Sequence, residues 1–240
     1  MKNILLPLGI LFSMIQPAFG QSAESDTFAA AGGNIVISFL GHGTLMLDIK
    51  GTVIRVDPVK QYADYKTLPK ADIILITHEH GDHLDQQAVT DASKSGTTII
   101  LNKSSYDKLK QGTVMANGEK KTVLGIGIEA VPAYNITAGR ENFHPKGRDN
   151  GYILTALGRR IYIAGDTENI PEMSGISNID IAFLPMNQPY TMTPEQAAQA
   201  AGIIKPKVLY PYHFGNTDAA KLAELLKGQP GLEVRIRKLQ

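Results

Sequence analysis

Apolar residues along the chain gather in short runs separated by Gly, Pro, Asp and Asn, a pattern typical of β-strands joined by turns. Two of the runs, 72–76 (DIILI) and 179–184, are almost continuously apolar, as expected of strands buried on both faces. Lys50-Gly51, between two other runs, suits a hairpin turn. The remaining strands are predicted over 34–40, 45–49, 52–56, 97–101, 122–124, 127–131, 152–156, 160–164 and 208–210.

Four segments between these strands are predicted to be helical. The segment 194–203 has the clearest start, because Thr193 can cap it, Pro194 takes its first position and Gln196 completes a capping box. The other three helices are expected over 85–93, 104–110 (with Ser104 as its cap) and 217–226. Strands that alternate with helices along a chain favour an α/β layered sandwich.

The first twenty residues differ from the rest and read as a signal peptide over 1–20. Lys2 is followed by an apolar run over 4–15, and Ala18 and Gly20 place small residues where signal peptidase reads them. We expect cleavage after Gly20 and a periplasmic or secreted protein. An uncleaved membrane anchor is the alternative, but the run is shorter than the roughly 20 residues that a membrane span needs. No stable membrane anchor is therefore expected after cleavage.

The rest of the chain reads as a short lead-in and one domain. Residues 21–33 are small, polar and rich in Gly and Ala, and we expect a flexible segment, followed by a single domain over 34–240. The formal net charge is +1 without a basic block, so no nucleic-acid surface is indicated. Because the chain has no cysteine, any metal site must use histidines and carboxylates.

A dense group of histidines follows the apolar run at 72–76. The segment His78-Glu79-His80-Gly81-Asp82-His83 holds three of the chain's six histidines. Two histidines two residues apart on an extended segment point to the same side, so both can face one ion, while Asp82 and His83 on the next turn can face a second. Imidazole and carboxylate ligands suit zinc. A polar loop without a metal is the alternative, and the clustering argues against it.

This motif resembles that of the metallo-β-lactamase superfamily, and the resemblance continues along the chain at three further residues. Asp57 matches the aspartate that orients the metal region, Asp166 matches the carboxylate that bridges two metals, and His213 matches the last metal histidine. The resemblance implies a four-layer αβ/βα sandwich with two mixed sheets packed face to face. It also implies two divalent metal ions, which we expect to be zinc.

One position departs from the family pattern. The family's middle histidine normally follows a strand near 128–135, where this chain has Asn135, and the next histidine is His144. We expect His144 to reach back from the loop and complete the first metal site, with Asn135 beside the metals or the substrate. The alternative is a surface His144 and a first site with only two imidazoles.

Three further segments narrow the resemblance. Residues 41–44, 165–167 and 185–195 are similar to those of the branch that contains ascorbate-6-phosphate lactonase, and in particular to its small bacterial metal-dependent hydrolases. The resemblance places His42 near the metals rather than on them. A buried His42 paired with a backbone carbonyl is the alternative.

The ligand set that this resemblance implies is that of a hydrolase. One ion is expected on His78, His80 and His144, the other on Asp82, His83 and His213, with Asp166 between them. A hydroxide activated by both metals would then cleave an ester, lactone, amide or phosphodiester bond, with Asp82 and Asp166 as the catalytic carboxylates.

Two other functions stay open. A non-catalytic metal- or ligand-binding periplasmic protein could share the fold. A di-iron oxygen or nitric-oxide reductase would place a carboxylate two residues after the first histidine, where this chain has His80.

The substrate is expected to be a small molecule, and five residues are expected to border its site: Tyr134, Arg140, Lys146, Arg148 and Tyr190. The three cations among them would suit an anionic substrate. They could equally be solvated loop charges.

Overall fold

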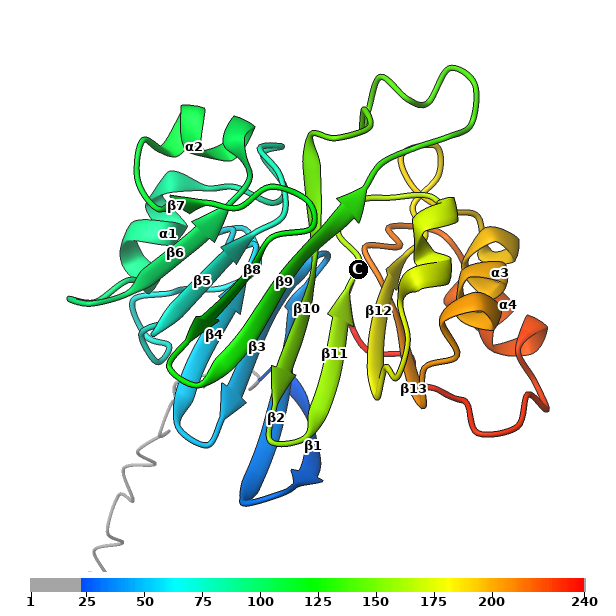
Figure 1. The fold of residues 1–240 in the computed structure, drawn as a ribbon, viewed down its shortest axis with the longest axis horizontal. Coiled ribbons are helices and arrows are strands. Elements are labelled where there is room, and N and C mark those ends of the chain that lie inside the picture. The colour runs from blue at the N-terminus through cyan, green and yellow to red at the C-terminus, as the bar shows by residue number, and fades with distance from the viewer. Residues whose placement is uncertain (1–22, 240) are drawn as a thin grey trace, which may run out of the picture.

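Two seven-stranded sheets form the centre of the structure, a computed structural model that describes residues 23–239 (Figure 1). The first sheet contains, in spatial order, β1 (Glu24–Ala30), β2 (Gly33–Gly41), β3 (Thr44–Ile49), β4 (Thr52–Val56), β5 (Ile73–Ile76), β6 (Thr98–Leu101) and β7 (Thr113–Val114). The second contains β8 (Lys120–Val123), β9 (Ile126–Ala133), β10 (Asp149–Ala156), β11 (Arg159–Ile163), β12 (Ile181–Pro185), β13 (Val208–Tyr212) and β14 (Glu233–Val234).

The two sheets share one pattern of strand pairing. In the first, β1 to β4 pair antiparallel and β4 to β7 pair parallel. In the second, β8 to β11 pair antiparallel and β11 to β14 pair parallel. Parallel neighbours need crossover connections, which contain the helices. These are α1 (Gln86–Ala92), α2 (Lys103–Leu109), the 3₁₀ helix η1 (Pro171–Gly175), α3 (Pro194–Ile204) and α4 (Ala219–Leu225).

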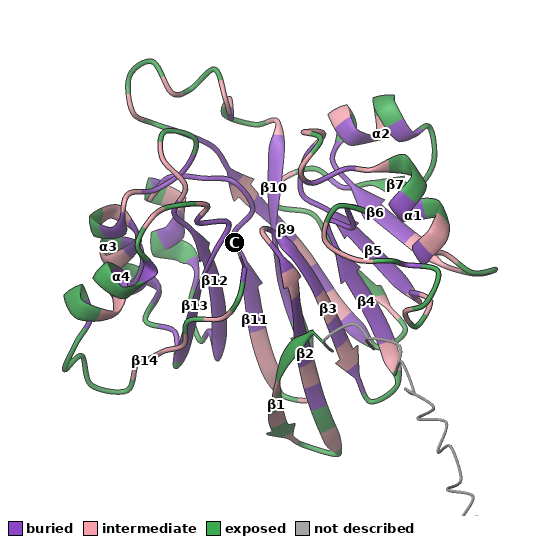
Figure 2. Cartoon of the chain, turned by 180° about the vertical axis from the view of Figure 1, so that it is seen from behind, coloured by how far each residue is buried: buried purple, intermediate pink, exposed green. Residues whose placement is uncertain are grey.

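The helices cover the outer faces of the sheets and complete the layered sandwich that was predicted (Figure 1). Buried residues run along the central strands of both sheets, while the exposed ones lie on loops, on the outer sides of the helices and on edge strands such as β1 (Figure 2). In β5, Ile73 and Leu75 face the core between the sheets, and Ile74 and Ile76 pack on the side of α1. The prediction that 72–76 forms a strand buried on both faces is confirmed.

The helix starts were predicted with mixed success. The capping box of α3 is present, since Thr193 and Gln196 bond to each other's backbone N–H. The predicted cap of α2 is wrong: the helix begins at Lys103, and the side chain of Asn102 accepts a hydrogen bond from the Ser105 N–H. Asn and Ser both suit an N-cap, so the sequence alone did not choose between them. The short edge strands β7 and β14 were not predicted because two residues show no period.

The segment 21–33, expected to be flexible, contains β1, so that expectation is wrong for Glu24–Ala30. The strand pairs with β2 along its whole length, from Glu24 opposite Phe39 to Ala30 opposite Gly33. Phe28 packs against the main core. The edge of β2 thus supplies the backbone hydrogen bonds and burial that composition did not reveal. The predicted signal peptide over 1–20 lies outside the described residues.

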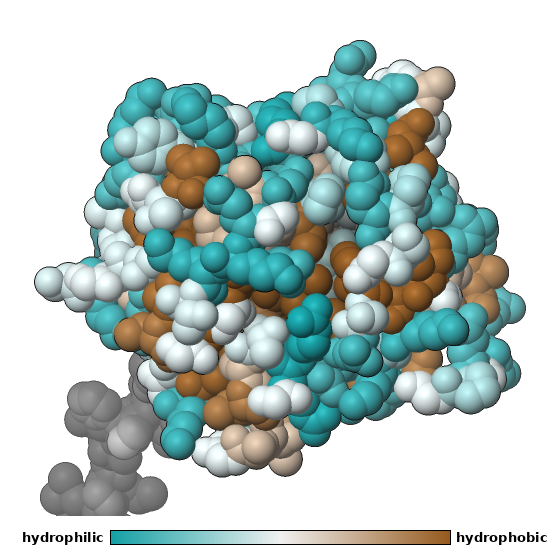
Figure 3. All heavy atoms as spheres, in the orientation of Figure 1, coloured by the Kyte–Doolittle hydropathy of each residue, from teal (hydrophilic) through white to brown (hydrophobic). Residues whose placement is uncertain are grey.

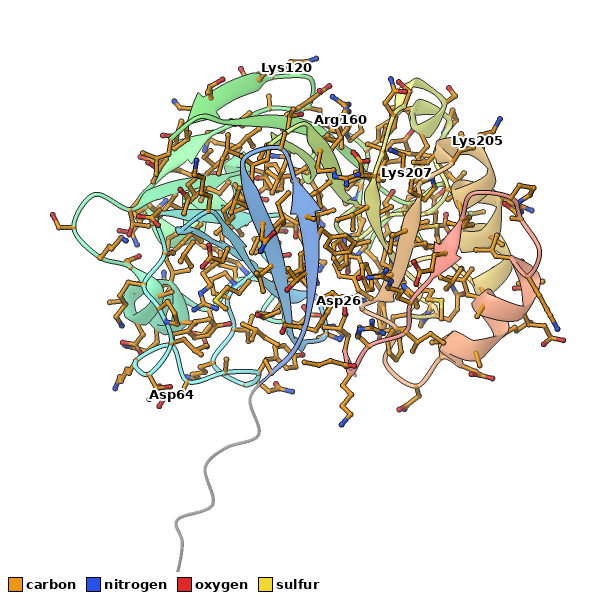
Figure 4. The ribbon with its side chains drawn as sticks, turned by 90° about the horizontal axis from the view of Figure 1, so that it is seen from below. Asp26, Asp64, Lys120, Arg160, Lys205 and Lys207 are labelled. Carbon is orange, nitrogen blue, oxygen red and sulfur yellow. The ribbon has the colours of Figure 1, made fainter. Side chains whose placement is uncertain are left out.

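Asp26 ties β1 to the C-terminal segment (Figure 4). Its carboxylate accepts a hydrogen bond from the Tyr210 hydroxyl. Arg237 Nη2 donates to both carboxylate oxygens, at 2.8 and 2.9 Å, and Arg235 Nη1 lies 3.3 Å from Oδ2. Burial opposes ionisation of this carboxyl, but the donors outweigh it and lower the pKa of Asp26. The first strand is therefore fixed at both its edge and its side chains.

The surface carries small hydrophobic patches separated by hydrophilic residues on the face shown in Figure 3. Within residues 23–239, no helix has both the length and the apolar character needed to cross a bilayer.

The Asp26 contacts predict a pH-dependent contribution to stability. Asp26→Asn should lower the free energy of unfolding at pH 7 by about 1 to 3 kcal/mol, because it weakens hydrogen bonds made to a charged group. The folded-state pKa is lowered from 3.8, so this stabilisation is present at neutral pH and is lost as the pH falls below about 4. Urea denaturation at pH 7 and pH 3 checks this; equal differences at both pH values would contradict it.

Candidate metal centre

Polar residues that follow strands of both sheets meet at one end of the sandwich. Asp57 follows β4, the segment 77–83 follows β5, Asp166 follows β11, and His213 follows β13. The chain also enters this region from the β2–β3 turn, which carries His42, and from the long β9–β10 loop, which carries His144. Within residues 23–239, three groups of these side chains have ligand atoms close enough to hold a metal ion.

The first group consists of His78, His80 and His144, with ligand atoms within 4.8 Å of one another. His78 Nε2 lies 3.1 Å from His80 Nδ1, and the ring of His144 is centred 4.9 Å from each of the other two rings. His144 is 1% exposed. The surface position considered as an alternative for His144 is therefore wrong, because the β9–β10 loop turns this side chain inward.

The second group surrounds the carboxylate of Asp82. Its Oδ2 atom lies 3.1 Å from His42 Nε2, 3.4 Å from His213 Nε2 and 3.8 Å from His83 Nε2. Burial opposes ionisation of Asp82, but the imidazoles of His213 and His42 lower its pKa. His42 pairs with Asp82 rather than with a backbone carbonyl. It is itself a member of this group, because its ligand atom lies within 4.8 Å of those of Asp82, His83 and His213.

Asp166 forms the third group with His78 and His83, lies between the first two groups and is 2% exposed. Its Oδ2 atom is 3.2 Å from His213 Nε2, 3.4 Å from His144 Nε2 and 3.9 Å from His78 Nε2. Its Oδ1 atom is 3.5 Å from His83 Nε2. One carboxylate thus faces imidazoles of both of the first two groups.

Several of the converging atoms fit a cation because they lack any other partner. Within the described residues, His83 Nε2, His213 Nε2 and Asp166 Oδ1 are buried and make no hydrogen bond. Buried polar atoms in proteins are nearly always paired, so unpaired donors and acceptors that point at one another need an explanation. A divalent cation that takes nitrogen and oxygen ligands would supply the missing partner.

Asp57 holds His83 in place for such a role. Its Oδ2 atom lies 2.8 Å from His83 Nδ1, while Oδ1 accepts the Thr77 N–H at 2.8 Å. Burial raises the pKa of Asp57, although His83 and Thr77 partly offset this. With Nδ1 bound to Asp57, only Nε2 of His83 is free to face Asp166 and Asp82. This matches the orienting role that the resemblance implied for Asp57.

Opposite charges in the centre stabilise one another's ionised forms. Burial opposes protonation of His83, but Asp166 and Asp57 together raise its pKa well above the usual value. Burial likewise opposes ionisation of Asp166, but His213 and His83 hold its pKa well below the usual range. A cation bound here would replace the proton of His83 as the partner of Asp166, so metal binding should release a proton.

The backbone is strained at three residues of the metal centre. His42, Asp57 and His213 have φ angles of 52°, 45° and 46°, in the left-handed region that non-glycine residues rarely adopt. A Cβ atom at Gly43 would lie 2.9 Å from His83 Cε1, so glycine is needed next to His42. Such strain persists only where the surrounding structure holds it, and it is concentrated at functional sites.

Asn135 and Tyr190 lie near the centre but outside the ligand groups. Asn135 is 2% exposed, and its side-chain amide donates to the carbonyls of Arg140 and Tyr190. Its backbone N–H donates to the His144 carbonyl at 2.8 Å. Asn135 therefore fixes the loop that carries His144. Tyr190 lines a pocket of about 320 Å³ that opens onto the two ligand groups.

Asp149 is a supporting residue that the sequence analysis missed. It is fully buried, and its Oδ2 atom lies 3.0 Å from His144 Nδ1. Arg148 binds the same carboxylate through Nε and Nη2 at 2.7 and 2.9 Å, and Asn102 contacts it as well. Asp149 thus orients His144 as Asp57 orients His83. The only sequence signal was an acidic residue at the start of a strand, which is too common to be informative.

Comparison with known proteins identifies the family. The profile of the Beta-lactamase superfamily domain matches residues 36–213. The chain belongs to the metallo-β-lactamase superfamily. It is 35% identical over 189 residues to a UPF0173 metal-dependent hydrolase of Ligilactobacillus salivarius, in a match that covers 74% of this chain and 84% of that protein. Within the superfamily, the hydrolase is therefore a member of the UPF0173 metal-dependent hydrolase family.

Solved structures agree with this assignment. A candidate metal-dependent hydrolase from Parabacteroides distasonis is 56% identical, with a TM-score of 0.89 over 91% of this chain and 100% of that one. Igni18, a metallo hydrolase from Ignicoccus hospitalis, is 25% identical, with a TM-score of 0.71 over 86% of this chain and 96% of that one. The predicted metallo-β-lactamase fold and the predicted class of metal-dependent hydrolase are confirmed.

The Asp149–His144 contact predicts an effect on metal affinity. Asp149→Asn should weaken zinc binding about 10- to 100-fold, because the acceptor that orients His144 loses its charge. Competition with a chromophoric chelator measures this affinity. Asp180→Asn is the matched control, since Asp180 is also largely buried and paired with Arg159 but lies away from the centre. Equal zinc affinity in both variants would contradict the role of Asp149.

Proposed function

We propose that the hydrolase binds two zinc ions and cleaves an ester, lactone, amide or phosphodiester bond of a small molecule. The position of Asp166 supports this best. Its buried carboxylate lies 3.2 to 3.9 Å from imidazole nitrogens of His78, His83, His144 and His213, which belong to both ligand groups. A single-ion site would not need a carboxylate shared in this way.

The residues divide between two ions. His78, His80 and His144 would hold the first, Asp82, His83 and His213 the second, and Asp166 would contact both. When bound, two such ions polarise a substrate oxygen and lower the pKa of water from about 15.7 toward 7.

The side chains of the hydrolase would contribute binding and orientation. Asp82 is the more exposed of the two carboxylates that line the pocket, with 45% of its side chain exposed. It can accept a hydrogen bond from a water molecule and orient that water toward the substrate. Its lowered pKa keeps it ionised at neutral pH. Asp166 is held inside the structure and would keep the two ligand groups at a fixed separation.

Two alternatives are weaker. A di-iron reductase would have a carboxylate at the position of His80, and the nearby Glu79 is bound away from the centre by Ser104 Oγ at 2.6 Å. A non-catalytic binding protein would not require the open, water-accessible carboxylate of Asp82.

Two further proposals concern the setting of the activity. We propose that the hydrolase is exported, because the leader-like pattern over 1–20 ends before β1, and cleavage after Gly20 would leave every described strand intact. We also propose that the hydrolase belongs to the branch of the superfamily that contains ascorbate-6-phosphate lactonase, because segments 41–44, 165–167 and 185–195 resemble those of that branch.

Removing either central carboxylate tests the proposed function. Asp82→Ala and Asp166→Ala should each lower kcat/KM on any substrate by about a hundredfold or more, because water orientation or the bridge is lost. Elemental analysis should find two zinc ions per chain in the parent protein and fewer in Asp166→Ala. Asp107→Ala is the control, since Asp107 lies on the surface of α2, where it pairs with Lys103. Near-normal turnover in either site variant would refute the proposal.

A further inference from the structure

The pocket above the metal centre has two unlike sides. One is formed by members of the ligand groups, namely His80, Asp82, His144, Asp166 and His213. The other is formed by Phe143 of the β9–β10 loop and by Asn187 and Tyr190 of the β12–α3 loop. These loops lie at the same end of the molecule (Figure 1). A substrate on the metals therefore meets two aromatic rings and one amide.

The two aromatic rings form a fixed wall. Their centroids are 5.0 Å apart with an interplanar angle of 74°, the edge-to-face arrangement that aromatic pairs prefer. The carbonyl of Phe143 accepts from Arg148 Nη2 at 2.7 Å, and the carbonyl of Tyr190 accepts from Asn135 Nδ2 at 2.7 Å. Tyr190 is nevertheless 45% exposed. An apolar ligand group can gain contact with it at little cost in reorganisation.

The cations near the pocket are already paired with carboxylates. Arg140 lies 3.3 Å from Glu168, Lys146 lies 2.8 Å from Glu172, and Arg148 binds Asp149. None of these cations lines the pocket, and its lining contains no Lys or Arg. These three cations thus stabilise the β9–β10 loop instead of facing the substrate. No side chain of the pocket lining would therefore attract a negatively charged group on a substrate away from the metal ions.

Asn187 offers the one amide side chain in the lining. Its amide makes no hydrogen bond within residues 23–239, although its backbone N–H binds Thr191 Oγ1 at 2.7 Å and so fixes the turn. A Cβ atom at Gly215 would lie 2.9 Å from Asn187 Oδ1, so the glycine after Phe214 is what makes room for this side chain. A free amide in this position can donate to a carbonyl or ring oxygen.

We propose that the substrate is an uncharged carboxylic ester or lactone with an apolar or aromatic group. That group packs on Phe143 and Tyr190, and Asn187 donates a hydrogen bond to an ester oxygen. The proposal rests on the proposed hydrolytic function. In the reaction, water adds across the acyl C–O bond, which yields a carboxylate, an alcohol and one proton.

Three p-nitrophenyl compounds test this in the zinc-loaded protein: the phenylacetate, the acetate and the bis-phosphodiester. The phenylacetate should have a kcat/KM about tenfold above that of the acetate, since a buried apolar group discriminates to this extent. It should also exceed the diester. Tyr190→Ala should bring the phenylacetate-to-acetate ratio close to one, and Tyr190→Phe should preserve it. Asp107→Ala, on the surface of α2 and outside the pocket lining, should leave the ratio unchanged.

A binding measurement separates failure of this inference from failure of the proposed function. N-methyl-2-phenylacetamide is an uncharged amide analogue of the ester, and calorimetry should show that Tyr190→Ala weakens its binding about tenfold. Equal affinity in parent and variant, or a diester hydrolysed faster than both esters, overturns the substrate class while the hydrolase stands. If none of the three compounds is hydrolysed, the substrate class is overturned, whereas the metal content and the Asp82→Ala and Asp166→Ala variants decide the hydrolytic function separately.

Discussion

Asp57, His83 and Asp166 are ionisable groups with almost no contact with solvent, and each is stabilised by the next. An isolated charge in this position would be strongly unfavourable, so the three must keep their contacts. Asp57 and His83 follow strands of the first sheet, while Asp166 follows a strand of the second. The pairing therefore fixes the two sheets relative to each other at the end where the metal centre forms.

The two sheets contribute to the centre from equivalent places. Asp57 follows β4 and Asp166 follows β11, each the first strand of a parallel series. His42 lies on the β2–β3 turn and His144 on the corresponding β9–β10 connection. The shared pairing pattern explains why residues far apart in sequence converge, since equivalent strand ends lie at the same end of the sandwich.

The halves differ in what they add. The first half has a two-residue turn between β2 and β3, and its contribution is the compact histidine motif after β5. The second half has the long loop from 134 to 148, whose own cations are bound by Glu168, Glu172 and Asp149. These ion pairs hold His144 and Phe143 in position. The first half thus forms most of the metal centre, and the second half shapes the pocket over it.

The sequence by itself determined the features that depend on neighbouring residues. The burial of 72–76, the capping box at Thr193 and the pairing of His78 with His80 follow from local period and spacing. The order of the histidines and aspartates along the chain also identified the family, because only a few residue types can bind a metal ion.

Only the tertiary structure decided what depends on distant partners. In the structure, His144 lies in the metal centre, whereas Asn135 bonds to the loop that carries it. Glu24–Ala30 forms a strand, and the loop cations pair with carboxylates instead of facing a ligand. Each of these outcomes is set by a charge, a hydrogen bond or a strand edge that lies far away along the chain. A local pattern shows that a side chain can pair, but the folded backbone determines what it meets.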